Sequence, residues 1–198
     1  MSWEPIETSL DTIESGLSNL NEDSLPSVLR ALDRFQQDPL VLIHRGVLTR
    51  YVSLICDNFF ELSSHTKLLR CKVFYTISKV VSWKRSVRYL PIDVYILKKL
   101  VPLLENQRED NWYIQFFILC WIYVLCLSPF QLEIDEKLYH LVSHCKAPST
   151  VPLVVNIRSQ LLSKNKALFH KYRDELDLST FNAILKLVIH QEDSVVDM

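Results

Sequence analysis

Three cations and two aromatic side chains stand together near the middle of the chain, in a segment suited to binding an acidic partner. The cations are Lys84, Arg85 and Arg88, and Trp83 and Tyr89 flank them. Clustered positive charge speeds the encounter with an acidic protein and orients its docking, and aromatic side chains add contact area. We therefore take these five residues as the candidate partner-binding site.

The wider surroundings of this segment are also cationic. Residues 65–99 hold nine basic and one acidic side chain, whereas residues 1–64 hold four basic and ten acidic ones. Five lysines of this stretch are more scattered, as on a solvated face: Lys67, Lys72, Lys79, Lys98 and Lys99. Basic and aromatic residues together also suit nucleic acid, but the pI of about 6.6 and the acidic ends argue against a nucleic-acid-binding protein.

A histidine pair forms a second group of residues with possible chemistry. His140 and His144 are four residues apart, so a helix would place both imidazoles on one face, as in metal-binding helices, and Cys145 follows directly. No Glu follows His140 in the HExxH manner, and no further ligand has the right spacing. The pattern favours a surface histidine pair near a helix C-terminus, where a cation is stabilised, and we expect no metal site.

Catalytic and nucleotide-binding patterns are absent from the sequence. The two glycines, Gly16 and Gly46, lie far apart, which excludes the Gly-rich loops that cradle phosphates. The five cysteines form no CxxC pair, and no signal peptide opens the chain, which fits the reducing cytoplasm. We expect no enzymatic activity and no cofactor.

The elements that must position these residues are helices. Apolar residues recur at steps of three and four, and the alternation typical of strands is nowhere sustained. With 198 residues and 48% apolar composition, the chain is long enough to bury a sizeable core. The predicted helices span about residues 6–20, 25–35, 40–61, 66–83, 94–105, 112–127, 135–145, 151–163, 166–176 and 178–190. Predicted N-caps are Ser24, Asp93 and either Asp110 or Asn111.

Two of these helices carry specific expectations about burial. Residues 112–127 are apolar except for Gln115, yet they would reach only roughly 24 Å, short of the ~30 Å of a hydrocarbon core. This length predicts a central helix covered on all sides, and no membrane span. In the last helix, one apolar stripe is predicted to face inward: Leu178, Phe181, Leu185 and Val188.

Short connections between successive helices favour a helical-repeat architecture. Helix pairs begin at intervals of about 35 to 50 residues, near the period of HEAT and armadillo repeats. The predicted fold is therefore an all-α, right-handed α-solenoid of HEAT/armadillo-like helical pairs. We expect a helical-repeat domain over residues 1–190 and a polar tail over 191–198, where a longer solenoid has been truncated, because a solenoid normally ends in a polar-faced capping repeat.

The segment from Trp83 to Phe130 resembles the N-terminal region of the tubulin-folding cofactor D family. The resemblance rests on the run from Trp83 to Tyr89 that closes with Pro91 and Asp93, then on Trp112, Trp121 and a Cys-Leu-x-Pro-Phe ending at Cys126, Leu127, Pro129 and Phe130. Ile92 and the pair Gln115-Phe116 depart from that pattern, which has His and Arg-Tyr in their places.

The resemblance implies a tubulin chaperone in the cytoplasm, associated with the microtubule cytoskeleton. Such a protein captures β-tubulin and helps to assemble and disassemble the αβ heterodimer, together with other tubulin-folding cofactors and an Arf-like small GTPase. Tubulin is strongly acidic, which agrees with a basic docking surface. A generic helical-repeat adaptor for complex assembly or transport is the alternative that the same helices would fit.

Overall fold

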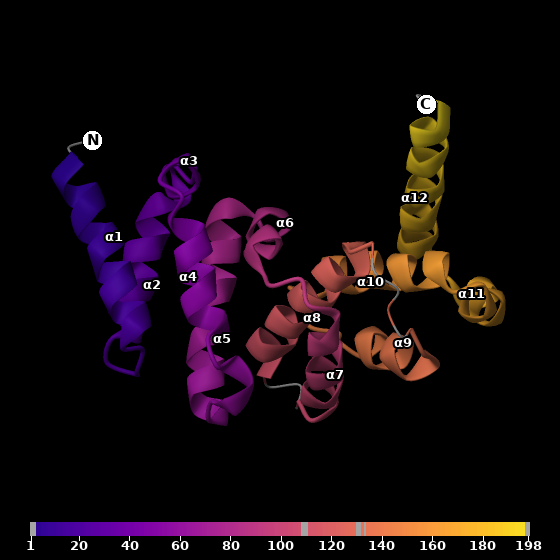
Figure 1. Cartoon of the computed structure of the whole chain (residues 1–198), viewed down its shortest axis with the longest axis horizontal. Coiled ribbons are helices and arrows are strands. Elements are labelled where there is room, and N and C mark those ends of the chain that lie inside the picture. Colours follow the sequence, from indigo (N-terminus) through magenta and orange to yellow (C-terminus); the bar gives the residue numbers. More distant parts are fainter. Residues whose placement is uncertain (1–2, 108–110, 130–131, 133, 197–198) are drawn as a thin grey trace. The chain divides into compact units, whose positions relative to one another are not determined.

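The computed structural model consists of helices joined by short loops (Figure 1). It describes residues 3–107, 111–129, 132 and 134–196, with side chains described for residues 6–189 of these ranges. The described residues contain no strand, so the predicted all-α class is confirmed. Two compact units divide the chain, Met1–Pro91 and Ile92–Met198. The single repeat domain over 1–190 with a tail at 191–198 stays a prediction.

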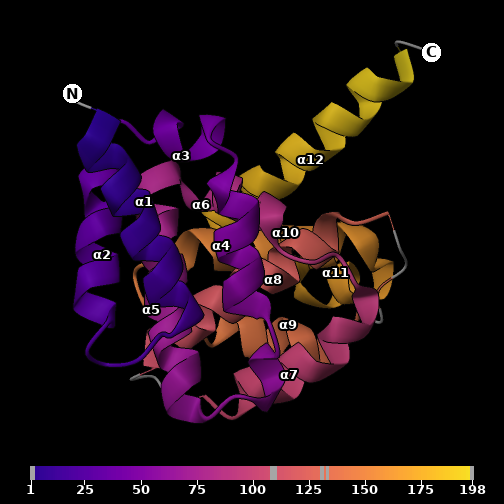
Figure 2. The ribbon, with the colours of Figure 1, turned by 60° about the vertical axis from the view of Figure 1, so that its left-hand side comes forward.

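The first unit begins with a tightly packed helix pair. It contains α1 (Trp3–Ser18), α2 (Leu25–Asp33), η1 (Arg34–Gln36), α3 (Leu40–His44), α4 (Val47–Cys56), η2 (Phe59–Glu61), α5 (Ser64–Val81), α6 (Trp83–Ser86) and η3 (Val87–Tyr89). Helix α1 packs on α2 and α4, and α5 packs on α2, α4 and α6 (Figure 2). A Cβ added to Gly16 of α1 would lie 2.3 Å from the Val28 side chain of α2. Only glycine lets these two helices approach so closely.

The predicted helix over residues 40–61 is wrong, because the chain breaks twice within it. Gly46 adopts a left-handed conformation with φ 67°, which ends α3 and starts α4 in a new direction. Asn58, with φ 48°, then separates α4 from η2. Glycine and asparagine tolerate this backbone region better than other residues, so apolar periodicity alone could not reveal the breaks.

Side-chain caps form at some of the predicted helix starts and not at others. Asp93 accepts a hydrogen bond from the Tyr95 amide, as predicted. Ser24 does not cap α2; its hydroxyl accepts from the Asn21 amide in the preceding turn. Asn111 makes no side-chain cap, and Asp110 lies outside the described residues. The helix predicted from Thr66 starts earlier, because Ser63 accepts from the Thr66 amide at 3.1 Å.

The second unit is organised around α8. Its elements are η4 (Val94–Ile96), α7 (Leu97–Glu105), α8 (Trp112–Leu127), α9 (Glu136–Ser143), α10 (Val151–Lys164), α11 (Lys166–Tyr172), η6 (Arg173–Glu175) and α12 (Leu178–Val196). Helix α8 packs between α7 and α10, and α10 also contacts α9, α11 and α12. Phe117 and Trp121 are 0% and 1% exposed, so the predicted central helix is confirmed. No helix in the described part of the chain is both long and apolar enough to span a membrane.

The predicted inward stripe of the last helix is wrong. Leu178, Phe181, Leu185 and Val188 are 74%, 47%, 43% and 44% exposed. The face that α12 turns toward α10 instead includes Thr180 and Ile184, which are buried. The periodicity correctly identified an amphipathic helix, but the apolar stripe is not the side that its own chain covers. The backbone of α12 continues to Val196, past the predicted end at His190.

Candidate partner-binding surface

The cationic segment forms a compact turn directly after the longest helix of the first unit. Helix α5 ends where Ser82 takes a positive φ of 75°, which redirects the chain into α6 and η3. The Ser82 carbonyl accepts hydrogen bonds from the amides of Arg85 and Ser86, each at 3.1 Å. A residue other than glycine at positive φ is strained, so the contacts on either side must hold this turn in place.

Buried residues of the same segment anchor it. Ser86 is fully buried, and its hydroxyl forms a 2.8 Å hydrogen bond with the Ser78 hydroxyl on α5. Val87 and Leu90 are 2% and 3% exposed, and η3 packs against α4. A buried polar pair with both partners present costs little and fixes orientation. The turn is therefore attached at Ser86, Val87 and Leu90.

The predicted site residues occupy the outer side of this turn. Lys84, Arg85 and Arg88 are exposed, while Trp83 and Tyr89 are half-buried. The Lys84 ammonium lies 5.8 Å from the centre of the Trp83 ring, within range of a cation–π contact. Arg85 and Arg88 form no ion pair with any described residue. Three cations on one short turn thus face solvent without a neutralising carboxylate from the described chain.

Other lysines of the basic stretch differ in setting from the turn at 83–89. Lys67 is half-buried and donates to the Phe60 carbonyl at 3.0 Å, which gives it a structural role. Lys98 and Lys99 belong to the second unit, so they are not part of the turn at 83–89. The segment from Trp83 to Tyr89 is the compact cluster.

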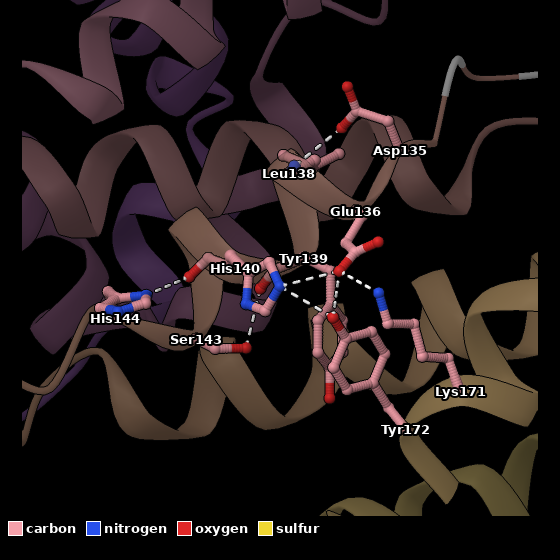
Figure 3. A network of polar contacts seen from close by, with 9 residues as sticks. All are labelled: Asp135, Glu136, Leu138, Tyr139, His140, Ser143, His144, Lys171 and Tyr172. Atoms are coloured by element: carbon pink, nitrogen blue, oxygen red, sulfur yellow. Dashed lines mark hydrogen bonds and ion pairs between the residues drawn. The ribbon is translucent and has the colours of Figure 1, made fainter.

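A polar network that the sequence did not predict joins α9 to α11 (Figure 3). Glu136 accepts hydrogen bonds through one oxygen from Lys171 Nζ at 2.6 Å and from the Tyr172 hydroxyl at 2.5 Å. His140 Nε2 lies 2.8 Å from the Tyr172 hydroxyl and 3.2 Å from the same Glu136 oxygen. The Tyr172 ring also stacks on Tyr139, with 4.6 Å between centroids. Only the spacing of Glu136 and His140 could have hinted at this network.

The protonation states of Glu136 and Tyr172 are consistent with a structural role, in which the network holds α9 against α11. The hydrogen bonds from Lys171, Tyr172 and His140 lower the pKa of Glu136 to about 2. The bond that the Tyr172 hydroxyl donates to Glu136 raises the pKa of Tyr172 above its usual value. The carboxylate is therefore charged and the phenol protonated at neutral pH. This arrangement connects two helices through a charged carboxylate and a protonated phenol.

The histidine pair and the cysteines are engaged in ordinary helix contacts. His144 Nδ1 donates to the His140 carbonyl at 2.7 Å, one turn earlier. Among the described residues, no group of three or more His, Cys, Asp or Glu side chains could hold a metal ion. Burial raises the pKa of Cys145 to about 11 and those of Cys56 and Cys126 to about 12. These thiols stay protonated at neutral pH, which makes them poor nucleophiles.

One cleft of about 390 Å³ lies in the first unit, between α1, η1 and α3. Its lining combines Ile6, Phe35 and Val41 with the charged residues Asp33 and Asp38. Arg34, also on its wall, already donates to the Ser9 hydroxyl at 3.1 Å. The lining has no convergent set of catalytic groups, and the turn at 83–89 contributes none of the lining residues.

The comparison with known protein families gives a match over most of the chain. The family described as "Tubulin-specific chaperone D-like, ARM repeat" matches residues 32–170. This range includes the cationic turn at 83–89 and extends from α2 to α11, while α12 lies beyond it. The predicted armadillo-like repeats are thereby confirmed. Phe130, the last residue of the resemblance, lies within the match but outside the residues that the structure describes. No solved structure matches the chain.

Proposed function

We propose that this chain, which belongs to the tubulin-specific chaperone D-like ARM-repeat family, is a scaffold that binds tubulin through the turn at Trp83–Tyr89. The observation that carries the proposal is the family match itself, which covers this turn completely. The exposure of Lys84, Arg85 and Arg88 supports it, since an acidic client needs cations that the scaffold does not already neutralise.

The turn would act mainly on the rate and orientation of docking. Exposed cations in solvent contribute little to affinity one by one, but together they steer an oppositely charged protein toward one surface. Trp83 and Tyr89 are half-buried, so each has an exposed part that can add apolar contact beside the cations. The anchors Ser86, Val87 and Leu90 keep the turn in one conformation, which reduces the entropy lost on binding.

The client that we assign is β-tubulin or the αβ heterodimer. In this proposal the chain holds the client while other tubulin-folding cofactors and an Arf-like small GTPase help to assemble or disassemble the heterodimer in the cytoplasm. The scaffold itself contributes binding and no covalent chemistry. The protonated thiols of Cys56 and Cys126 are consistent with that role.

The test is a measurement of association between the purified chain and αβ-tubulin. Lys84, Arg85 and Arg88 are changed together to Glu, and the control changes three other exposed cations, Arg30, Lys146 and Lys166, to Glu. Both variants change the net charge equally. We expect the turn variant to lose most of its association rate and the control to retain most of it. Association of the wild type should also weaken with salt, because the Debye length falls from about 10 Å at 0.1 M to about 3 Å at 1 M.

Two results would contradict the proposal. Equal loss in both variants would mean that overall charge, rather than the turn, governs binding. Full binding by the turn variant, without salt dependence, would place the interface elsewhere. If the chain captures other proteins but no tubulin, the generic adaptor is the better description.

A further inference from the structure

The cleft between α1, η1 and α3 combines an apolar floor with an acidic rim. Phe35 is 5% exposed, Ile6 and Val41 are half-buried, and these three side chains form the floor. Asp33 and Asp38 are exposed and form the rim. The volume of about 390 Å³ lies at the lower end of the range for ligand pockets, which is about 300 to 1,000 Å³. The cleft therefore has room for a few side chains of a ligand and not for a folded domain.

The two rim carboxylates are available to a ligand. No cation in the described part of the chain forms an ion pair with Asp33 or Asp38. Asp33 accepts one hydrogen bond through Oδ1, from the Gln36 side-chain amide at 2.7 Å. Attraction between opposite charges is stronger beside an apolar protein surface than in bulk water, because the effective dielectric constant is lower there. The rim is therefore suited to a positively charged group.

One cation also lines the cleft, but it is already engaged. Arg34 donates through Nη1 to the Ser9 hydroxyl of α1 at 3.1 Å, and Ser9 is 3% exposed. The lining has two carboxylates and this one guanidinium, so its charge remains negative. The surrounding sequence adds to this charge, since residues 1–64 hold ten acidic and four basic side chains. A field of this sign attracts a cationic segment.

Contacts outside the rim hold the walls of the cleft together. Arg45, at the C-terminal end of α3, lies 2.7 Å from the Glu7 carboxylate on α1. The bond from Arg34 to Ser9 connects η1 to the same helix. Neither Arg45 nor Glu7 lines the cleft, so this ion pair leaves the rim carboxylates unused. A site whose walls are already in place loses less conformational entropy when a ligand enters.

The arrangement of apolar floor and acidic rim matches the side chain of Lys or Arg. Both of these side chains lay an aliphatic stem along apolar surface and keep the charged head at its edge. An apolar side chain alone would leave the rim without a partner, and an acidic one would be repelled by Asp33 and Asp38. A basic residue beside an apolar one makes use of both parts of the site.

We propose that this cleft binds a short basic segment of a protein partner. A Lys or Arg stem packs on the floor, its charged head meets the rim, and a neighbouring apolar side chain fills the rest of the cleft. The site is separate from the turn at 83–89, which contributes none of its lining residues. The two surfaces have opposite charge, so the turn suits an acidic client and the cleft a basic one. A contact of this size is weak, and we expect a dissociation constant on the order of 100 µM.

The experiment is a titration of the whole chain with three synthetic peptides that share Gly-Ser flanks. Their central sequences are Leu-Lys-Leu, Leu-Glu-Leu and Ser-Lys-Ser. Each peptide is added from about 10 µM to about 2 mM, a range that brackets the expected equilibrium, and NMR shifts of the backbone amides report binding and its location. The Leu-Lys-Leu peptide should shift amides of residues 6–9 and 33–41. It should bind at least about fivefold more tightly than either of the other two, which lack the charge or the apolar contact.

Variants of the rim connect the binding to the two carboxylates. Asp33→Asn combined with Asp38→Asn removes both charges and nearly preserves side-chain size, so the fold should be kept, and far-UV circular dichroism verifies this. The double variant should bind the Leu-Lys-Leu peptide at least about fivefold more weakly. The matched control combines Asp11→Asn with Asp23→Asn, two exposed residues of the same unit that do not line the cleft. This control should bind the peptide like the wild type.

Binding of the Leu-Lys-Leu peptide in the cleft, weakened by the rim variant and not by the control, would support the proposal. Equal or tighter binding of the Leu-Glu-Leu peptide overturns it, because Arg34 would then govern the site. Equal weakening in both double variants overturns it as well, since overall charge would then explain the binding. The absence of shifts at residues 6–9 and 33–41 with every peptide up to about 2 mM also overturns it.

Discussion

Helices α8 and α12 differ in how the chain covers their apolar residues. Helix α8 is apolar except for Gln115, it packs on α7 and α10, and twelve of its sixteen residues are buried, Trp121 included. Helix α12 has a clear polar side and a clear apolar stripe, yet Phe181 in that stripe is 47% exposed. Amphipathic patterning is usually read as the sign of a helix packed on its own core. Here the helix without such patterning is the better covered of the two.

The difference shows what apolar periodicity does and does not report. It identifies the residues whose burial lowers the free energy. It does not identify the helix that packs against them. In α8 the apolar residues are covered by contacts with α7 and α10 of the same unit. In α12 the side that faces α10 carries Thr180 and Ile184, while the residues of the more apolar stripe are exposed.

The largest effect is expected at the centre of α8. Trp121 is 1% exposed and meets Phe117 edge to face, with 5.4 Å between ring centroids. Trp121→Ala should lower the free energy of unfolding by about 3 to 5 kcal/mol, because it removes a large buried side chain and leaves a cavity. Chemical denaturation followed by circular dichroism measures this loss. A change below about 1 kcal/mol would mean that α8 is not the buried centre of its unit.

Most of the helices could be predicted from the sequence, and the exceptions have local causes. Residues 112–127 and 178 onward were placed correctly at their starts because long apolar or amphipathic runs identify helices well. The break at Gly46 and the turn at Ser82 depend on single residues with positive φ. A serine in that conformation has no sequence signature, since surrounding packing imposes it.

The candidate site was predictable in part. Clustering of Lys84, Arg85 and Arg88 is visible in the sequence, and the structure places all three on the exposed side of one turn. Their role as a partner-binding site stays a prediction. The Glu136 network was missed because Lys171 and Tyr172 come from another helix more than thirty residues away. Such a contact depends on tertiary packing, which local spacing does not encode.

The network between α9 and α11 holds two helices together through charged groups. Removing its carboxylate should affect stability less than Trp121→Ala does. The pKa of Glu136 is lowered to about 2 from an ordinary value of 4.5, so its contribution to stability is complete above about pH 4.5. That contribution is lost as the pH falls from about 4.5 toward 2, when the native carboxylate must take up a proton. Glu136→Gln should therefore flatten the acid side of the stability curve between these values.

A matched control is available in the same unit. Glu105 is 46% exposed, against 45% for Glu136, but among the described residues it accepts only from Lys137, at 2.8 Å. Melting temperatures measured from pH 7 down to about pH 3 for Glu136→Gln, Glu105→Gln and the wild type separate the two sites. Glu105→Gln should keep the acid-dependent loss. If Glu136→Gln keeps it too, the network does not hold its carboxylate in the charged state.

The smallest effect is expected on the exposed stripe of α12. Shortening a side chain there should affect stability much less than the same change in α8. Phe181→Ala should change the stability of the isolated monomer by only about ±0.5 kcal/mol, as surface substitutions usually do. Scanning calorimetry measures the change in stability. A loss of several kcal/mol would instead mean that the chain itself covers Phe181, and α12 would then resemble α8 after all.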